Sequence, residues 1–255
     1  MKTRLIAALA TLVLGGSLLL ASVGVVMAAV PAGPTGVAGP AGQGVCLKEA
    51  TSATKIRSLD TLRAFGDCEI NRRFTTLDQL AVKVGASKYL TNPDATALKT
   101  IIDQTRHGLT TLKATIDVQI NPKLLRSEIV QIATKFRVYL LVVPQVNLVN
   151  GADAVLFAQT GFGKVNTVLA ARIATQKAAG KNVATAQDDL AAMNAQVTAA
   201  VALASPEPAL LLSLTPAEYN AGHVGLTTVR ANLIQARDDL RTALAEAQAC
   251  RNALR

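Results

Sequence analysis

Residues 136–149 read FRVYLLVVPQVNLV, and this stretch decides the fold because it lies where one helical pattern stops and another begins. The apolar residues leading into it are spaced by alternating steps of four and three, as on one face of a helix: Leu125, Ile129, Ile132, Phe136 and Tyr139. Residues 140–143 are then apolar on every side. Pro144 has no N–H and disfavours helical geometry in the residue before it. We therefore predict that one helix ends near Val142 and that Pro144 lies in the first turn of the next.

A short apolar break between two helices has to be buried, because it would otherwise expose several valines to water. Two interpretations are open. The simpler is a buried corner at which two helices meet. The other is a pocket for a hydrophobic ligand, lined by Tyr139, Val142, Val143, Pro144 and Val146.

Helix signals recur along the chain on both sides of this break. Asn92-Pro93-Asp94 and Asn121-Pro122 each combine a capping side chain with a first-turn proline. Thr215-Pro216-Ala217-Glu218 has the spacing of a capping box, and Gly180 is a typical helix C-terminal residue. The first helix is expected over 51–87 with a kink near Gly66, where its apolar stripe changes register.

These signals predict an all-α protein: an elongated up-down bundle of about six long antiparallel helices, broken near Pro144. The last helix is expected to run from the Thr215 capping box to Leu254, about 58 Å. Val138–Val143 is the one stretch that resembles a strand, and a strand there would have no partner.

The composition narrows the classes of function. Half of the 255 residues are hydrophobic, only 3% are aromatic and none is Trp, which argues against a surface that stacks on nucleotide bases. The formal net charge is +9, but the basic residues are scattered, with Arg72-Arg73 the tightest pair. Such a charge suits an anionic partner of the cell envelope and not a nucleic acid, which is bound by a clustered basic stripe.

The N-terminal region predicts export. Lys2 and Arg4 precede a long apolar run, and Val26-Met27-Ala28 fits a signal-peptide cleavage site, so residues 1–28 are expected to be a signal peptide. A membrane anchor that is not cleaved is the alternative, and it would be the chain's contact with a membrane. Residues 29–45 are rich in Pro and Gly and predict a flexible tether, and 46–255 form the helical domain.

Motifs for catalysis are not found. His107 and His223 have no Cys or acidic residue at metal-ligand spacing. Gly161-Phe162-Gly163-Lys164 lacks the first glycine and the final Ser or Thr of a phosphate loop. We predict no catalytic residue, no metal and no cofactor, and expect a protein that is not an enzyme, although an enzyme of another type stays open.

Three segments resemble a family of exported bacterial helical proteins without an established activity: INRRFTTLDQL (70–80), KFRVYLLVVPQVNLV (135–149) and LTPAEYNAGH (214–223). The resemblance implies an all-α secreted protein and assigns no activity.

Two functions follow from these patterns. The first is an exported, non-enzymatic protein with a structural or interaction role at the cell envelope, and a protein or an anionic envelope component as its partner. The alternative is a binder of a hydrophobic small molecule near Val142–Pro144.

The three cysteines allow one disulfide within the chain if the protein is exported. A helix that begins at Thr51 would place Cys68 about 25 Å along it, whereas the five residues from Cys46 to Thr51 span only about 17 Å. Six alternating helices would bring the end of the last helix beside the start of the first. We therefore expect a Cys68–Cys250 bond, with Cys46 free or paired between chains.

Overall fold

The structure is a computed structural model, in which residue 46, residues 58–222 and residues 225–255 are described. The expected signal peptide (1–28) and tether (29–45) lie outside the described residues.

The described residues are helical with short connections, and they include no strand. The all-α prediction is therefore confirmed. The elements are α3 (Leu59–Ala86), α4 (Asn92–Val118), α5 (Pro122–Thr134), the π-helical turn η1 (Val138–Val142), α6 (Val143–Ala178), α7 (Ala184–Ala204), α8 (Glu207–Ser213), α9 (Pro216–Asn220) and α10 (Leu226–Ala253).

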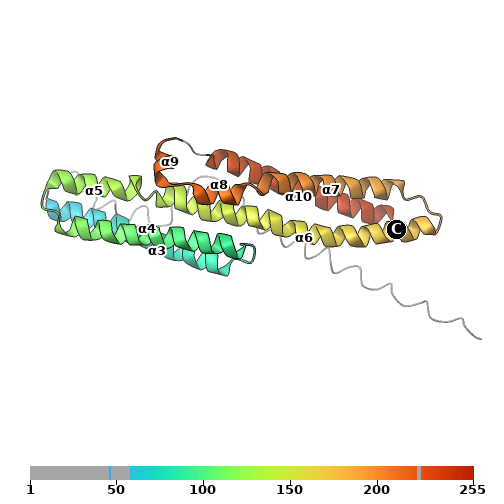
Figure 1. The fold of residues 1–255 in the computed structure, drawn as a ribbon, viewed down its shortest axis with the longest axis horizontal. Coiled ribbons are helices and arrows are strands. Elements are labelled where there is room, and N and C mark those ends of the chain that lie inside the picture. The colour runs from blue at the N-terminus through green and yellow to red at the C-terminus, as the bar shows by residue number, and fades with distance from the viewer. Residues whose placement is uncertain (1–45, 47–57, 223–224) are drawn as a thin grey trace, which may run out of the picture.

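The helices form two groups that share one long helix (Figure 1). α3, α4 and α5 pack together at one end of the molecule, and α7 and α10 pack against each other toward the other end. The 36-residue α6 extends from the first group along the second, while α8 lies across its N-terminal part. The first and last long helices are thus at opposite ends, and the expectation that they are antiparallel neighbours is wrong. The prediction treated all helices as one bundle and missed that α6 is long enough to serve two.

The expected kink near Gly66 is also wrong, because α3 continues through this residue. Gly66 is buried, and a Cβ placed on it would lie 3.4 Å from the side chains of Ile116 and Ile129. The glycine therefore lets α3 approach α4 and α5 closely. The change in the apolar stripe at this point reflects a change of packing partner along a continuous helix.

The break before α6 differs from the expected one in its position. α5 ends at Thr134, and Arg137 adopts a left-handed conformation (φ 45°), the one non-glycine among the described residues to do so. The carbonyl of Arg137 accepts from the N–H of Leu141 (2.7 Å) and of Val142 (3.3 Å), which begins the π-helical turn. The helix therefore ends eight residues before the predicted Val142.

Pro144 lies in the first turn of α6, as predicted. The chain changes there from π-helical to α-helical hydrogen bonding.

The chain after residue 214 forms two helices, α9 and α10, where a single helix was predicted. The Thr215–Glu218 capping box is confirmed, but the helix that it opens ends at Asn220, and Gly222 follows with φ 81°. α10 then begins at Leu226 and extends over 28 residues, about 42 Å. At the end of α6, Gly180 (φ 75°) is followed by a bond from the N–H of Lys181 to the carbonyl of Gln176, so the predicted termination there is confirmed.

Gly108 provides a test of the packing between α4 and the break. A Cβ at this position would overlap the ring of Phe136, which is largely buried. Gly108→Ala is expected to lower the free energy of unfolding by about 1–3 kcal/mol through overpacking. Gly163→Ala is the control, because nothing lies within 4 Å of its added Cβ, and it should raise that free energy by about 0.5–1 kcal/mol. Equal effects in urea denaturation would contradict the described contact.

Candidate functional site

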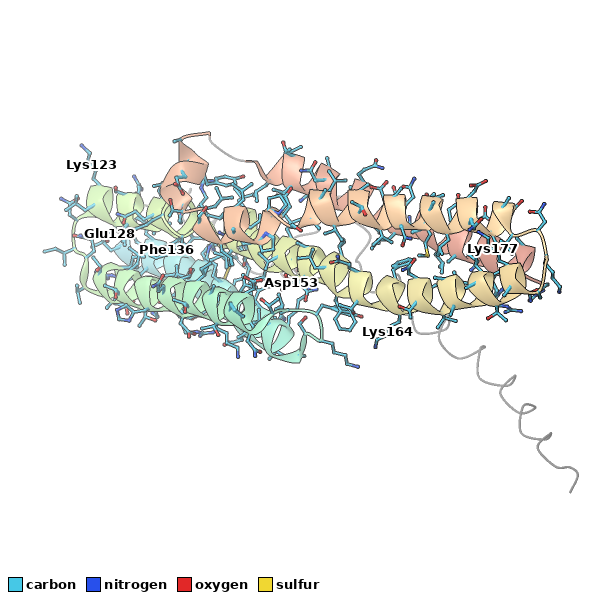
Figure 2. The ribbon with its side chains drawn as sticks, turned by 45° about the vertical axis from the view of Figure 1, so that its right-hand side comes forward. Lys123, Glu128, Phe136, Asp153, Lys164 and Lys177 are labelled. Atoms are coloured by element: carbon cyan, nitrogen blue, oxygen red, sulfur yellow. A yellow bond between two sulfur atoms is a disulfide. The ribbon has the colours of Figure 1, made fainter. Side chains whose placement is uncertain are left out.

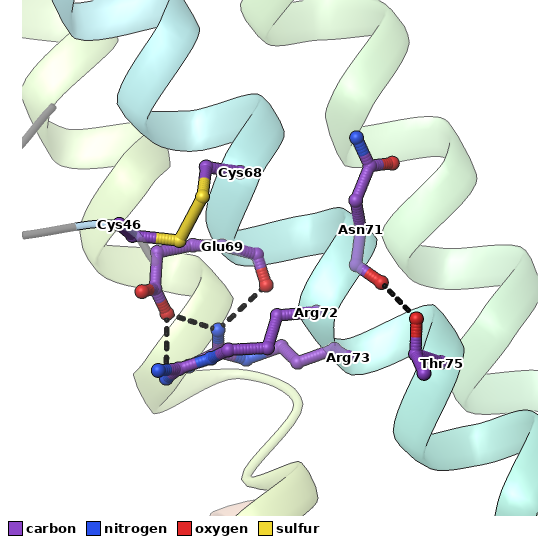
Figure 3. The surroundings of a disulfide bond; sticks show 7 residues. All are labelled: Cys46, Cys68, Glu69, Asn71, Arg72, Arg73 and Thr75. Atoms are coloured by element: carbon purple, nitrogen blue, oxygen red, sulfur yellow. Dashed lines mark hydrogen bonds and ion pairs between the residues drawn. A yellow bond between two sulfur atoms is a disulfide. The ribbon is translucent and has the colours of Figure 1, made fainter. Parts of the chain in front are cut away.

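Tyr139, the aromatic member of the predicted pocket, contacts two arginines of α3. The guanidinium carbons of Arg72 and Arg73 lie 5.1 and 5.0 Å from the centre of its ring. Glu69 accepts from Arg72 at 3.1 Å and from Arg73 at 2.6 Å, so its carboxylate holds both arginines (Figure 3). The hydroxyl of Tyr139 is buried without a hydrogen bond. This residue therefore acts through its ring, as a surface on which the two cations stack.

A second arginine–tyrosine contact fixes the other side of the break. The guanidinium of Arg137 lies 5.3 Å from the ring centre of Tyr219 on α9, and its Nε donates to Asn220 at 2.6 Å. Asn220 in turn donates to the carbonyl of Thr134, the last residue of α5, at 2.8 Å. The three segments that carry the family resemblance therefore meet at the break, since 70–80 contributes Arg72 and Arg73 and 214–223 contributes α9.

The five predicted pocket residues do not share one environment. Val142 and Val146 are buried in the core, while Tyr139, Val143 and Pro144 are half-buried. α8 packs over this part of α6. The burial of Val142 and Val146 fits the corner interpretation, and the pocket at these five residues stays a prediction.

Gln145 is a contact residue at this corner that the sequence analysis missed. Its side chain is buried and donates to the carbonyls of Leu211 and Leu214, both at 2.8 Å. These bonds attach the end of α8 to the start of α6. The signal in the sequence is a single polar residue between Pro144 and Val146 in an otherwise apolar run.

An open groove with a volume of about 460 Å³ lies between α6 and α7, far from Pro144. Its apolar lining consists of Ala170, Ile173, Ala174, Leu190 and Ala191. Lys177, Gln187 and Asn194 add polar groups. Small side chains on both helices leave room for the backbone of another chain or for an apolar ligand to approach. This groove was not predicted from the sequence.

α7, which forms one wall of the groove, belongs to an apolar stretch of the chain that is only partly buried. Two stretches of described residues, Pro122–Ala178 and Ala184–Ser213, are long and apolar enough by composition to cross a membrane. Burial inside the protein reaches 56% in the most apolar part of the first, and only 33% in that of the second. The first stretch includes the central core helix, whereas α7 and α8 present much of their apolar surface to the outside.

A row of polar contacts joins α6 to the last turn of α3 and to the loop between α3 and α4. Three α6 side chains, spaced three residues apart, each accept one hydrogen bond: Asn147 from Lys83 (2.5 Å), Asn150 from Ser87 (2.5 Å) and Asp153 from the backbone of Thr91 (2.8 Å). Tyr89 and Phe157 extend the row with an edge-to-face ring contact at 5.5 Å. This row holds the α3–α4 hairpin against the shared helix.

Asp153 is the least well satisfied member of this row. Its side chain is in the core (1% exposed), and its Oδ1 has no hydrogen bond. Burial raises the pKa of Asp153 to about 6, and the nearby carboxylate of Asp94 raises it further. The charged form is therefore destabilised in the folded protein. No sequence pattern indicates this, because an acid at the edge of an apolar helix is indistinguishable from a surface residue.

The cysteines pair differently from the prediction. Cys46 and Cys68 form the disulfide, with their Cα atoms 5.8 Å apart (Figure 3). Cys250 is free and buried, and its thiol donates to the carbonyl of Ala186 on α7. Burial raises the pKa of this thiol. The Cys68–Cys250 prediction is wrong because α3 and α10 lie in different groups of helices.

The prediction excluded Cys46 because it assumed a helix that begins at Thr51. Residues 47–57 lie outside the described residues, and the described α3 begins at Leu59, so Cys68 lies about 14 Å along it.

Comparison of the chain with protein-family models, with curated proteins and with solved structures found no match. The resemblance to exported helical proteins therefore stays a prediction. The geometry itself offers stacked cations that fix the break and an open apolar groove that can receive a partner.

The stacking of Tyr139 leads to a prediction about two variants. Tyr139→Leu removes the aromatic ring that Arg72 and Arg73 contact, and should lower the free energy of unfolding by about 1–3 kcal/mol. Tyr139→Phe keeps the ring and removes a hydroxyl that has no hydrogen bond, so that free energy should change by less than about 1 kcal/mol. Urea denaturation measures both, and an equal loss in the two variants would show that the hydroxyl matters instead of the ring.

The raised pKa of Asp153 leads to a prediction about pH. At pH values between the pKa of Asp153 in the unfolded chain and its pKa in the folded protein, the folded protein binds the carboxyl proton more tightly than the unfolded chain does. Its contribution to stability is therefore complete at low pH and is lost as pH rises, by about 3 kcal/mol between about pH 4 and about pH 7. Asp153→Asn should remove this slope and be more stable than the parent at pH 7.

Asp103→Asn on the exposed face of α4 is the matched control for this experiment, and should retain the slope of the parent. Thermal denaturation over the pH range measures all three proteins. Parallel curves for Asp153→Asn and the parent would contradict the assignment.

Proposed function

We propose that this protein is exported and has a non-enzymatic interaction role at the cell envelope, with the α6–α7 groove as its binding surface. The groove carries the proposal, because it is apolar and open, and one of its walls is α7, in a stretch whose most apolar part is only 33% buried inside the protein. A partner helix with an apolar face fits such a surface, since small residues let two helices approach closely. The disulfide between Cys46 and Cys68 supports export, because such bonds persist in oxidising compartments.

The arrangement of the helices also supports a structural role. α6 is packed by α3, α4 and α8 near its start and by α7 and α10 farther along. A helix held by neighbours along its length resists bending, so the groove keeps a fixed position relative to the α3–α5 end. The protein would thus hold a partner bound in the groove at a fixed distance from a second partner that contacts the α3–α5 end.

The second candidate is the binding of a hydrophobic small molecule. The groove volume of about 460 Å³ is in the range of small-molecule pockets, about 300–1,000 Å³. This volume supports the α6–α7 groove as a site for such a molecule, in addition to the predicted site near Val142–Pro144.

Photo-crosslinking in the exporting cell tests the proposal. A benzophenone amino acid at Lys177, a groove residue, should give a discrete adduct with an envelope protein. The same amino acid at Val82, which is 71% exposed on α3, should not give that adduct. Ala174→Glu places a charge in the groove and should lower adduct formation about tenfold, since an unpaired charge has to be desolvated on binding.

Ala171→Glu is the matched control, because it adds the same charge to an exposed position of α6 outside the groove lining. Native mass spectrometry of the exported protein distinguishes the second candidate. A bound small molecule that Ala174→Glu alone removes would favour ligand binding. Adducts that are equal at Lys177 and Val82, with no retained molecule, would contradict both functions.

A further inference from the structure

The turn between α4 and α5 exposes a group of apolar side chains at the end of the molecule opposite to the groove. Val118 is 75% exposed, Ile120 is 79% exposed and Leu124 is 52% exposed, and Pro122 is exposed between them. Figure 2 shows Lys123 projecting outward from this same end, which we call the α4–α5 tip (residues 118–126). Large apolar residues this exposed do not contribute to the core, so the fold does not account for them.

Several polar backbone groups of the tip are paired within the protein. Asn121 accepts from the N–H groups of Lys123 (2.9 Å) and Leu124 (3.3 Å), and its own N–H donates to the side chain of Gln119 (3.0 Å). The carbonyl of Gln119 accepts from Arg63 at 2.6 Å, which ties the tip to α3. Each of these paired groups loses little when it leaves water, which lowers the cost of contact with a hydrocarbon phase.

The charges around the tip favour an anionic surface. Lys123 and Arg126 are exposed and form no ion pair with a described residue. Of the acids nearby, Asp60 pairs with Arg63 and Asp117 pairs with Lys113. Glu128 forms no ion pair with a described residue, but it is half-buried and accepts from Gln119. The exposed charge without an ion pair beside the apolar residues is therefore positive, which matches the headgroups of anionic lipids.

We propose that the α4–α5 tip inserts its apolar side chains into the interface of an anionic lipid bilayer, with Lys123 and Arg126 contacting the headgroups. The tip is small, so it rests on the membrane surface and does not cross it. The rod would then stand on the bilayer through α4 and α5, with the α6–α7 groove held away from it (Figure 1). This contact stands on its own residues and does not require the groove to bind a partner.

The absence of Trp from the chain permits a direct test on the full-length protein. Ile120→Trp places one fluorophore at the tip, and Val82→Trp places one at an equally exposed apolar site elsewhere. With vesicles that contain phosphatidylglycerol, Ile120→Trp emission should shift to shorter wavelength and be quenched by brominated lipid. Val82→Trp emission should change in neither way, and vesicles of phosphatidylcholine alone should produce a much weaker effect at position 120.

The charges are tested in the Ile120→Trp protein by Lys123→Gln and Arg126→Gln. Each lost cation should weaken binding to anionic vesicles about fivefold, which corresponds to about 1 kcal/mol per cation. Equal responses of the two fluorophore positions would overturn the proposal, since the N-terminal segment or nonspecific adsorption would then account for binding. If the emission of Ile120→Trp responds to an envelope protein but not to any vesicle, the proposal is overturned in favour of a protein contact.

Discussion

The left-handed backbone of Arg137 is the constraint on which the rest of the structure depends. This conformation costs a residue with a Cβ roughly 1–2 kcal/mol, so it persists only where neighbouring contacts hold it. Those contacts come from α9, where Asn220 accepts from the Arg137 guanidinium and Tyr219 stacks against it. Because Arg137 ends one helical path and starts the π-helical turn, it sets the direction in which α6 leaves the first group of helices.

The contacts that follow from this direction join segments far apart in the sequence. The π-helical turn presents Tyr139 to Arg72 and Arg73 and brings Phe136 against Gly108. α6 then passes the α3–α4 loop and makes the row of polar contacts that ends at Asp153. The same helix continues to α7 and α10, so its direction also places the groove relative to the α4–α5 tip. A protein with apolar surfaces at two separated places, joined by a helix packed along its length, is suited to connect two partners.

The sequence predicted the features that depend on local chemistry. Capping at Thr215, the first-turn prolines at 93, 122 and 144, and the end of α6 at Gly180 all depend on a few adjacent residues. The features it did not predict depend on distant partners. Gly66 was predicted to be a kink, but a glycine is needed there because the side chains of Ile116 and Ile129 pack against it. The cysteine pairing was predicted wrongly because it depends on which helices are neighbours. The groove was missed for a related cause, since alanine on a helix fits a close helix contact and an open surface equally well.

The central claim is that η1 and α6 form one continuous, straight path from the break to the far end of the molecule. The distance between spin labels at Leu140 and Val168 tests it most directly, with both labels attached through unnatural amino acids so that the native cysteines stay intact. Both positions are exposed, and 28 residues of helix separate them by roughly 40 Å. Pulsed electron paramagnetic resonance should give one narrow distance distribution near that value. A broad distribution, or one centred at a much shorter distance, would show that α6 bends or hinges and would contradict the account.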